Sequence, residues 1–277
     1  MKKILKNKMC FFGLAIVLFF FALAFFGSYL TRHSHIEHNL NRRLEAPSSD
    51  HIMGTDDLGR DIFARVVAGS RISLSVGFVS VGIALLIGVP LGLLAGFYGK
   101  WIDRLIMRAV DIMLCFPSIF LILMVIAFLG PSIYNVMIVI GLTSWPGLAR
   151  YVRGETLSVR RREYILAAEM MEISKVRILF IHILPNTIAP VIISAALGVG
   201  SAILSESILS FLGLGVQPPD PSWGNILTLG KDYITHNTWW LLVFPGAAIL
   251  LTVVSFNMIG EGLRDVLDPR HRSESER

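Results

Sequence analysis

The amino-acid sequence predicts an all-α membrane protein with six transmembrane helices, and three observations lead to this prediction. Hydrophobic residues make up 54% of the 277 residues, and the mean hydropathy is +0.65. Several windows of about 20 residues are almost wholly apolar, which is the length that an α-helix needs to cross a bilayer. The basic residues lie mainly at the ends of these windows. The net charge of +5 therefore reflects membrane topology and does not indicate binding to nucleic acid.

The first apolar window covers residues 11–30 and follows a start that contains four lysines. This pattern is also typical of a secretory signal peptide, and residues 22–24 resemble a cleavage site. The run is longer than a usual signal core and continues past that site, so we predict an uncleaved first span. Residues 1–71 then comprise a cytoplasmic N-terminus, the first transmembrane helix and an external segment.

Three histidines, His33, His35 and His38, lie beside Glu37 in the external segment. Imidazole groups at close spacing are ligands for nickel, zinc and copper ions, so this cluster is a candidate metal site. The alternative interpretation is a solvated histidine-rich loop, and the sequence favours this alternative.

The external segment ends in G-T-D-D-L-G-R-D-I-F-A-R at residues 54–65. The Gly and Asp residues predict turns in the first half of this sequence. Asp61 and Arg65 are four residues apart, which favours a short helix with an ion pair in the second half.

Three further spans are predicted at residues 72–98, 105–129 and 135–149. Five glycines interrupt the first of these, and small residues allow helices to approach closely in lipid. A short basic turn at residues 99–104 and an uncharged turn at residues 130–134 connect the three spans.

Residues 150–186 form the longest basic interruption of the apolar chain and predict two short amphipathic helices. The spacing of Tyr164, Ala167, Ala168 and Met171 places these four residues on one helix face. Ser174 is suited to cap the second helix, and Pro185 to end it. Such helices form a docking platform for a soluble partner, and the alternative is a solvated connector on the lipid headgroups.

The last two spans are predicted at residues 187–212 and 239–263, with a loop rich in Gly, Pro and Trp between them and a charged tail, residues 264–277, after them. One side of the membrane then holds four Lys or Arg in the N-terminus, three around residues 99–108, seven in the 150–177 loop and four in the tail. The other side holds seven. This asymmetry predicts that both termini and the loop are cytoplasmic.

The sequence contains no phosphate-binding G-x-x-x-x-G-K-[ST] motif, no H-E-x-x-H and no G-x-S-x-G, so we predict neither an enzyme nor a cofactor. Acidic residues inside spans are functional candidates, and Asp111 and Glu206 are the main ones. For Asp111 a structural pair with Arg108, one turn earlier, is favoured. For Glu206, which lies beside Ser205, cavity lining and a structural helix contact remain equally open.

Several segments together resemble permease subunits of bacterial ABC importers, and more narrowly the dipeptide, oligopeptide and nickel permease family. The 150–186 loop is similar to the coupling loop of that family. The matching segments are G-T-D-D-L-G-R-D-I-F-A-R (54–65), R-A-V-D-I-M-L-C-F-P (108–117), A-A (167–168), I-L-P-N (183–186), S-F-L-G-L-G-V-Q-P-P-D-P-S-W-G (210–224) and F-N-M-I-G-E-G-L-R-D-V-L-D-P (256–269). Their order and spacing make the resemblance specific over residues 54–269.

The resemblance implies a type I importer fold, with residues 72–263 as the transmembrane core, in the bacterial inner membrane. It also implies a second permease subunit as the partner in a heterodimer, two ATPase subunits and an external substrate-binding protein. The coupling residues would be Tyr164, Ala167, Ala168, Met171 and Glu172. The residues of the translocation path would be Glu206, Ser205 and Asp111.

Two positions depart from the family pattern. Many importers have Glu before the two alanines, where this chain has Leu166, and the family usually has Gly where this chain has Glu172. Glycine eases a turn between helices, so Glu172 must form the turn in another way or continue the helix.

The resulting hypothesis is a permease subunit of an ATP-driven importer of di- or oligopeptides. A nickel or metal-chelate importer is the alternative substrate class, because of His33, His35 and His38. A self-contained secondary transporter or an intramembrane enzyme is the alternative of a different class. The first would show inverted repeats and midplane ion ligands, the second a reactive pair within the spans, and the sequence shows neither.

Overall fold

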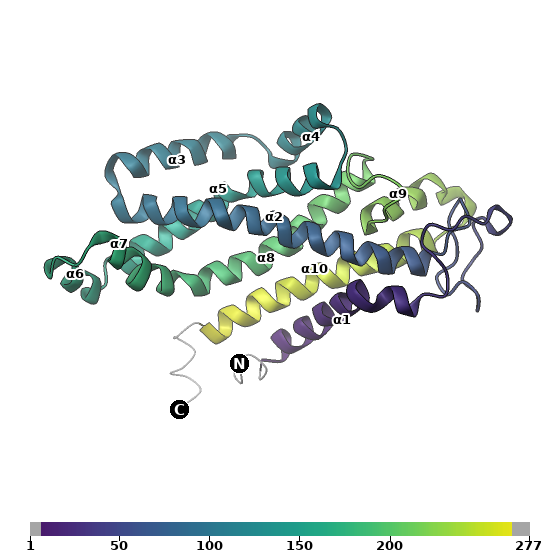
Figure 1. The fold of residues 1–277 in the computed structure, drawn as a ribbon, viewed down its shortest axis with the longest axis horizontal. Coiled ribbons are helices and arrows are strands. Elements are labelled where there is room, and N and C mark those ends of the chain that lie inside the picture. The colour runs from purple at the N-terminus through teal and green to yellow at the C-terminus, as the bar shows by residue number, and fades with distance from the viewer. Residues whose placement is uncertain (1–6, 268–277) are drawn as a thin grey trace.

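The computed structural model of the protein describes residues 7–267, and within this range it is helical apart from turns, irregular segments and one isolated bridge between Thr55 and Asp61 (Figure 1). Most of the tail predicted at residues 264–277 thus lies outside the described residues. The helices are α1 Lys8–Leu30, α2 Ile62–Tyr98, α3 Lys100–Cys115, α4 Ser118–Leu129, α5 Ile133–Arg160, α6 Glu163–Met170, α7 Lys175–Arg177, a π-helical segment Ile178–Ile183, α8 Leu184–Phe211, α9 Trp223–Asp232 and α10 Trp240–Leu267, with short 3-10 turns at Leu40–Arg42 and Ile234–His236.

Within residues 7–267, four helical stretches are long and apolar enough to cross a membrane, and a fifth crossing is added if the bent pair α3 and α4 counts as one span. The four are Lys8–Gly27, Ile62–Tyr98, Lys175–Phe211 and Trp240–Val266. Helix α5 is not among them, because polar residues interrupt its apolar part and Arg150 follows it. The membrane class is therefore confirmed, whereas the count of six spans is not.

Close contact between α2 and α5 forms the centre of the bundle, and α1 lies along α10 (Figure 1). Gly88, Gly92 and Gly96 face α5 at successive turns of α2. A β-carbon at Gly92 would lie 2.6 Å from the carbonyl oxygen of Ala149, so a larger residue would push the two helices apart. These three glycines of the second predicted span thus serve helix packing, as small residues do in membrane proteins.

The span predicted at residues 105–129 is not one straight helix. It is divided into α3 and α4, which meet at an angle of 83°. Pro117 is the cause, because it has no N–H group and restricts Phe116 to an extended conformation, with φ −96° and ψ 131°. The predicted turn at residues 99–104 is also shorter than expected, since α3 begins directly after Gly99.

The second helix of the 150–186 loop does not end at Pro185. Instead α7, the π-helical segment and α8 continue without a break from Lys175 to Phe211. Pro185 lies in the first turn of α8, where its missing N–H is tolerated, and the wider π turn precedes it. Ser174 occupies the N-cap position of α7, as expected, but its side chain accepts no capping hydrogen bond.

The loop predicted at residues 213–238 contains a helix, α9. The hydroxyl of Ser222 accepts a hydrogen bond from the Asn225 amide, and the side chain of Asn225 accepts one from the Ser222 amide. This capping box starts the helix. Trp223 is fully buried and donates its Nε1–H to the carbonyl of Val66 at 3.0 Å, so α9 is fixed against the start of α2.

Candidate functional site

A groove lined by small residues lies between α2, α5 and α8. Its volume is 240 Å³, and no charged side chain of the described chain lines it. Ser80 comes from α2, Ser144 from α5, and three more serines from α8. The full lining consists of Ser80, Val81, Ala84, Leu85, Ile140, Ser144, Gly147, Leu148, Tyr151, Ser194, Ala195, Gly198, Ser201, Ala202 and Ser205.

The serine hydroxyls make the groove polar without adding charge. Ser205 donates a hydrogen bond to the carbonyl of Ser201 at 2.9 Å, and Ser144 donates to Ile140 at 2.6 Å. Ser80 donates to the carbonyl of Met137 on α5 at 2.9 Å and so joins two helices. Because each hydroxyl oxygen has two lone pairs, these groups can still accept hydrogen bonds from a molecule in the groove.

Ser205 is the predicted path residue that lines this groove. The sequence analysis did not predict the other serines of the groove as path residues, although those of α8 follow a helical spacing in the sequence. Ser194, Gly198, Ser201 and Ser205 follow the spacing i, i+4, i+7, i+11, which places four small residues on one face of α8.

Glu206 does not line the groove, although it is the neighbour of Ser205. Its side chain is fully buried and reaches Ser73 of α2. The carboxylate accepts a hydrogen bond from Ser210 at 2.6 Å and longer ones, both 3.5 Å, from Ser73 and Ser207. Glu206 therefore lies in a buried hydrogen-bond network and does not belong to the lining of this groove.

Asp111 also lies away from the groove, and its partner is not Arg108. Arg150 of α5 donates a hydrogen bond to Oδ1 of Asp111 at 2.6 Å, and both side chains are more than half exposed. A second pair joins the same two helices, since Arg153 donates to Asp103 at 2.6 Å. The two pairs connect α3 to α5, and Asp111 takes part in one of them.

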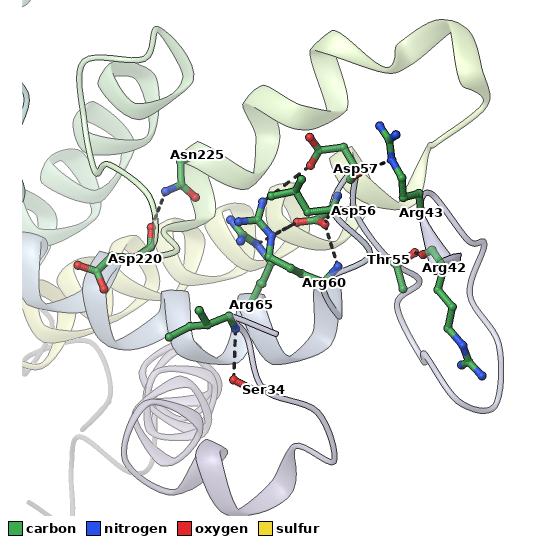
Figure 2. Close-up of polar contacts among 12 residues, drawn as sticks. Ser34, Arg42, Arg43, Thr55, Asp56, Asp57, Arg60, Arg65, Asp220 and Asn225 are labelled. Atoms are coloured by element: carbon green, nitrogen blue, oxygen red, sulfur yellow. Dashed lines mark hydrogen bonds and ion pairs between the residues drawn. The ribbon is translucent and has the colours of Figure 1, made fainter. Parts of the chain in front are cut away.

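Residues 31–61, which we call the cap segment, cover one end of the helices (Figure 1). They are organised around the buried Asp56, on which Arg60 and Arg65 converge in Figure 2. Arg60 donates to Oδ2 of Asp56 at 2.6 Å, and Nε of Arg65 lies 3.6 Å from the same oxygen. Nε and Nη1 of Arg65 have no hydrogen-bond acceptor among the described residues.

The ion pair predicted between Asp61 and Arg65 is wrong. Asp61 caps α2 by accepting a hydrogen bond from the amide of Ala64 at 2.7 Å, and its other oxygen contacts His51 at 2.8 Å. The helix that begins at Ile62 is also not a short one, because it continues as α2 to Tyr98.

The histidines predicted as one cluster are separated. His33 lies beside His51, with ring centroids 4.6 Å apart, whereas His35 and His38 belong to no group of metal-ligating side chains found among the described residues. The segment around them is irregular, so neighbouring positions in the sequence point in different directions.

Of the 150–186 segment, residues 161–174 connect α5 to α7 and contain α6. This α6 loop lies at the opposite end of the bundle from the cap segment (Figure 1). Arg160 anchors it to α2, because Nη1 donates to the carbonyl of Phe97 at 2.6 Å. Nε of the same guanidinium lies 3.4 Å from Glu169 of α6. Ile165 is fully buried against the ends of α2 and α5, so α6 is held in a fixed orientation.

The four residues predicted to share one face of α6 differ in their exposure to solvent. Tyr164 and Met171 are 44% and 70% exposed, and Ala167 is exposed as well. Ala168 is only 6% exposed, because it packs with Ile165 against the same chain. The exposed face of α6 and its C-cap therefore includes Tyr164, Ala167, Met170 and Met171. Leu166, which replaces the glutamate of the family pattern, is 47% exposed.

Glu172 forms the turn by adopting the left-handed conformation that glycine favours, with φ +54°. The amide of Ile173 donates to the carbonyl of Ala168 at 3.2 Å, and that of Glu172 donates to Glu169 at 3.1 Å. These two bonds define a Schellman motif, in which glycine is the usual residue at the position of Glu172. The turn keeps the shape that glycine would give it, at the cost of backbone strain.

We therefore expect Glu172→Gly to stabilise the turn by roughly 0.5–1 kcal/mol, because the left-handed conformation costs less for glycine. Hydrogen exchange of the amides at residues 172–174 should slow about two- to five-fold in the purified protein. Glu172→Ala is the matched control. It removes the same carboxylate but keeps the β-carbon, so it should give no such protection, and equal protection in both variants would contradict the explanation.

These features define a class of protein: a helical membrane subunit with an uncharged polar groove between its helices and an ordered loop exposed at one end. The chain belongs to the family described as binding-protein-dependent transport system inner membrane component, which matches residues 88–273. Residues 1–47 match the N-terminal transmembrane domain of oligopeptide transport permease C. The chain is thus a permease subunit of an ABC transporter.

Individual relatives agree with this assignment. The dipeptide transport system permease protein DppC of Alkalihalophilus pseudofirmus is 49% identical over 98% of this chain and 89% of its own length. The glutathione transport system permease protein GsiD of Pectobacterium atrosepticum is 42% identical over 93% and 85%. In structure, the chain resembles the inward-facing MetNI methionine ABC transporter, with a TM-score of 0.60, 20% identity, and coverage of 73% of this chain and 96% of that one. This likeness confirms the permease fold.

Proposed function

We propose that this chain carries di- and oligopeptides across the bacterial inner membrane through the serine-lined groove. The 49% identity with a dipeptide permease over nearly the whole chain is the observation that best supports this proposal. The chemistry of the groove agrees with it. Hydroxyl groups bond to peptide N–H and C=O groups whatever the side chains, and an uncharged lining does not select for one charge.

Transport requires partners that this chain does not supply. A second permease subunit would complete the wall of the groove, and an external binding protein would deliver the substrate. Two ATPase subunits would supply the energy, because the sequence has no phosphate-binding loop of its own. Their docking surface is the exposed face of α6, formed by Tyr164, Ala167, Met170 and Met171, and the turn at Glu172 sets its orientation.

An uptake experiment tests the proposed substrate. Cells that lack this chain should lose uptake of a labelled dipeptide at limiting concentration, while uptake of ⁶³Ni²⁺ should not change. Ser205→Trp should reproduce the loss, because an indole at this position would fill a groove of 240 Å³. Ile112→Trp is the control, since Ile112 is 62% exposed on α3 and lies outside the groove. Loss of nickel uptake with normal dipeptide uptake would contradict the proposal.

The proposed orientation places the α6 loop and both termini in the cytoplasm and the cap segment outside. Single cysteines at the exposed Ser158 and Gln217 should therefore react with a membrane-impermeant maleimide from opposite sides. The native Cys115 is exposed and must first be replaced by serine. We expect labelling of Gln217→Cys in intact cells, and labelling of Ser158→Cys only after the membrane is opened. Labelling of both in intact cells would overturn the orientation.

A further inference from the structure

Three side chains that can bind a metal ion meet at the junction of the cap segment and α2. His33 follows the end of α1, His51 lies in the middle of the cap segment, and Asp61 is the N-cap of α2. One nitrogen or oxygen from each lies within 4.8 Å of the other two. A cavity of 360 Å³, also lined by Glu37 and Asp50, opens beside them.

Two of the three groups are already held in place. His51 and Asp61 are each 5% exposed, and Nδ1 of His51 lies 2.8 Å from Oδ2 of Asp61. Oδ1 of Asp61 accepts the hydrogen bond from Ala64, which fixes the plane of the carboxylate. A hydrogen bond of this kind on the non-ligating oxygen is typical of carboxylates that bind metals.

We propose that His33, His51 and Asp61 bind one divalent transition-metal ion of the zinc or nickel type. Two imidazoles and one carboxylate form a ligand set for such ions, with a fourth position open to solvent or another donor. The ion takes the place of the hydrogen between Nδ1 of His51 and Oδ2 of Asp61. Nδ1 binds the ion through its lone pair, and the one proton of the neutral ring then resides on Nε2.

The geometry requires little rearrangement. Ligand atoms in a tetrahedral site are roughly 3.3 Å apart when the metal–ligand bonds are about 2.0 Å. The 2.8 Å separation of His51 and Asp61 is close to this value. His33 has to move the most, because its half-buried ring must give up the exposed 3.2 Å contact of Nε2 with the carbonyl of Asp50 to reach the ion.

The site differs from the histidine cluster read from the sequence. His35 lines a different cavity from the one beside His51 and lies near Arg65, and burial together with this charge lowers the pKa of His35 against the opposing effect of Asp220. His38 is exposed and lines neither cavity. Only His33 of the three joins the group, and its partners come from positions that the spacing did not reveal.

The ion would act as a cross-link. It would join the end of α1, the middle of the cap segment and the first residue before α2, which are otherwise connected by irregular chain. None of the three ligands lines the serine groove, so the ion is not placed as cargo. We assign it the role of stabilising the cap segment, and this role is independent of which substrate crosses the membrane.

The test uses the full-length permease without a histidine tag, purified with its partner subunits and stripped with a chelator. Titration calorimetry with ZnCl₂ and NiCl₂ should show one high-affinity site for each copy of this chain, and bound metal should raise the unfolding temperature. His33→Ala should weaken binding at least about tenfold and abolish the metal-dependent rise, because it removes one of three ligands. Its metal-free unfolding temperature should match that of the wild type, since His33 is half exposed.

His38→Ala is the matched control and should bind as the wild type does. A wild type without stoichiometric binding would overturn the proposal, as would His33→Ala with unchanged affinity or His38→Ala with an equal loss. Asp61→Asn provides a second test, because its remaining oxygen can still cap α2 while the negative ligand is lost. Dipeptide uptake by His33→Ala should remain, so failure of the metal site and failure of the proposed transport function are distinguishable.

Discussion

Replacement of Asp56 by alanine is expected to lower the stability of the cap segment by about 3–5 kcal/mol, because it leaves two buried guanidinium groups without their shared carboxylate. Arg60 and Arg65 are 7% and 3% exposed, so water cannot replace the lost partner. Two backbone hydrogen bonds are lost as well, since Oδ1 of Asp56 accepts from the amides of Leu58 and Arg60 at 2.9 Å. All of these contacts are made by the one carboxylate of Asp56, so we expect the whole cap segment to unfold locally when it is removed.

Limited trypsin digestion of the purified subunit measures this effect, because cleavage after Arg42 and Arg43 reports opening of the cap segment. Asp50→Ala is the matched control in the same segment. Its ion pair with Arg42 at 3.1 Å is exposed on both sides, so its loss should cost at most about 1 kcal/mol. Similar digestion rates for Asp56→Ala and Asp50→Ala would contradict the central role of Asp56.

A second large effect is expected from Ala167→Arg, which should abolish transport while leaving the subunit folded. Ala167 lies on the exposed face of α6 between Tyr164 and Met171, where an ATPase subunit would cover it. A long charged side chain buried there without a partner costs several kcal/mol. Co-purification of the ATPase should therefore fall at least about tenfold, and dipeptide uptake should be lost.

The neighbouring substitution Ala168→Arg should fail in a different way. Ala168 is packed against Ile165 and the ends of α2 and α5, so arginine there disrupts the loop of this chain itself. Protease sensitivity of residues 161–174 should rise in Ala168→Arg but not in Ala167→Arg. Ser158→Arg adds the same charge at an exposed position of α5. It should change neither the co-purification of the ATPase nor the protease sensitivity of residues 161–174. Normal ATPase retention in Ala167→Arg would show that this face of α6 is not the docking surface.

The sequence by itself determined the membrane class and the positions of most apolar helices. Long apolar windows have only one stable arrangement in lipid, because a helix satisfies every backbone hydrogen bond within the segment. The amphipathic pattern also predicted a helix over Tyr164 to Met171, and the unusual Glu172 marked the turn that ends it. These are local properties, set by hydropathy, periodicity and the conformational preferences of single residues.

The tertiary structure alone decided which residues face one another. Adjacent positions on a helix diverge by about 100°, and this places Ser205 in the groove and Glu206 in a buried serine network on another side. For the same reason Ala167 is exposed while Ala168 packs against its own chain.

The partners of Asp111 and His33 are also a matter of tertiary structure. Arg150 and His51 lie far from them along the chain, and they come close only when α3 folds back onto α5 and the cap segment folds over α2. The spacing of residues in a sequence identifies side chains that are neighbours on the same helix or strand. Charge pairs and ligand sets are formed between elements, and their members are decided by how the helices pack.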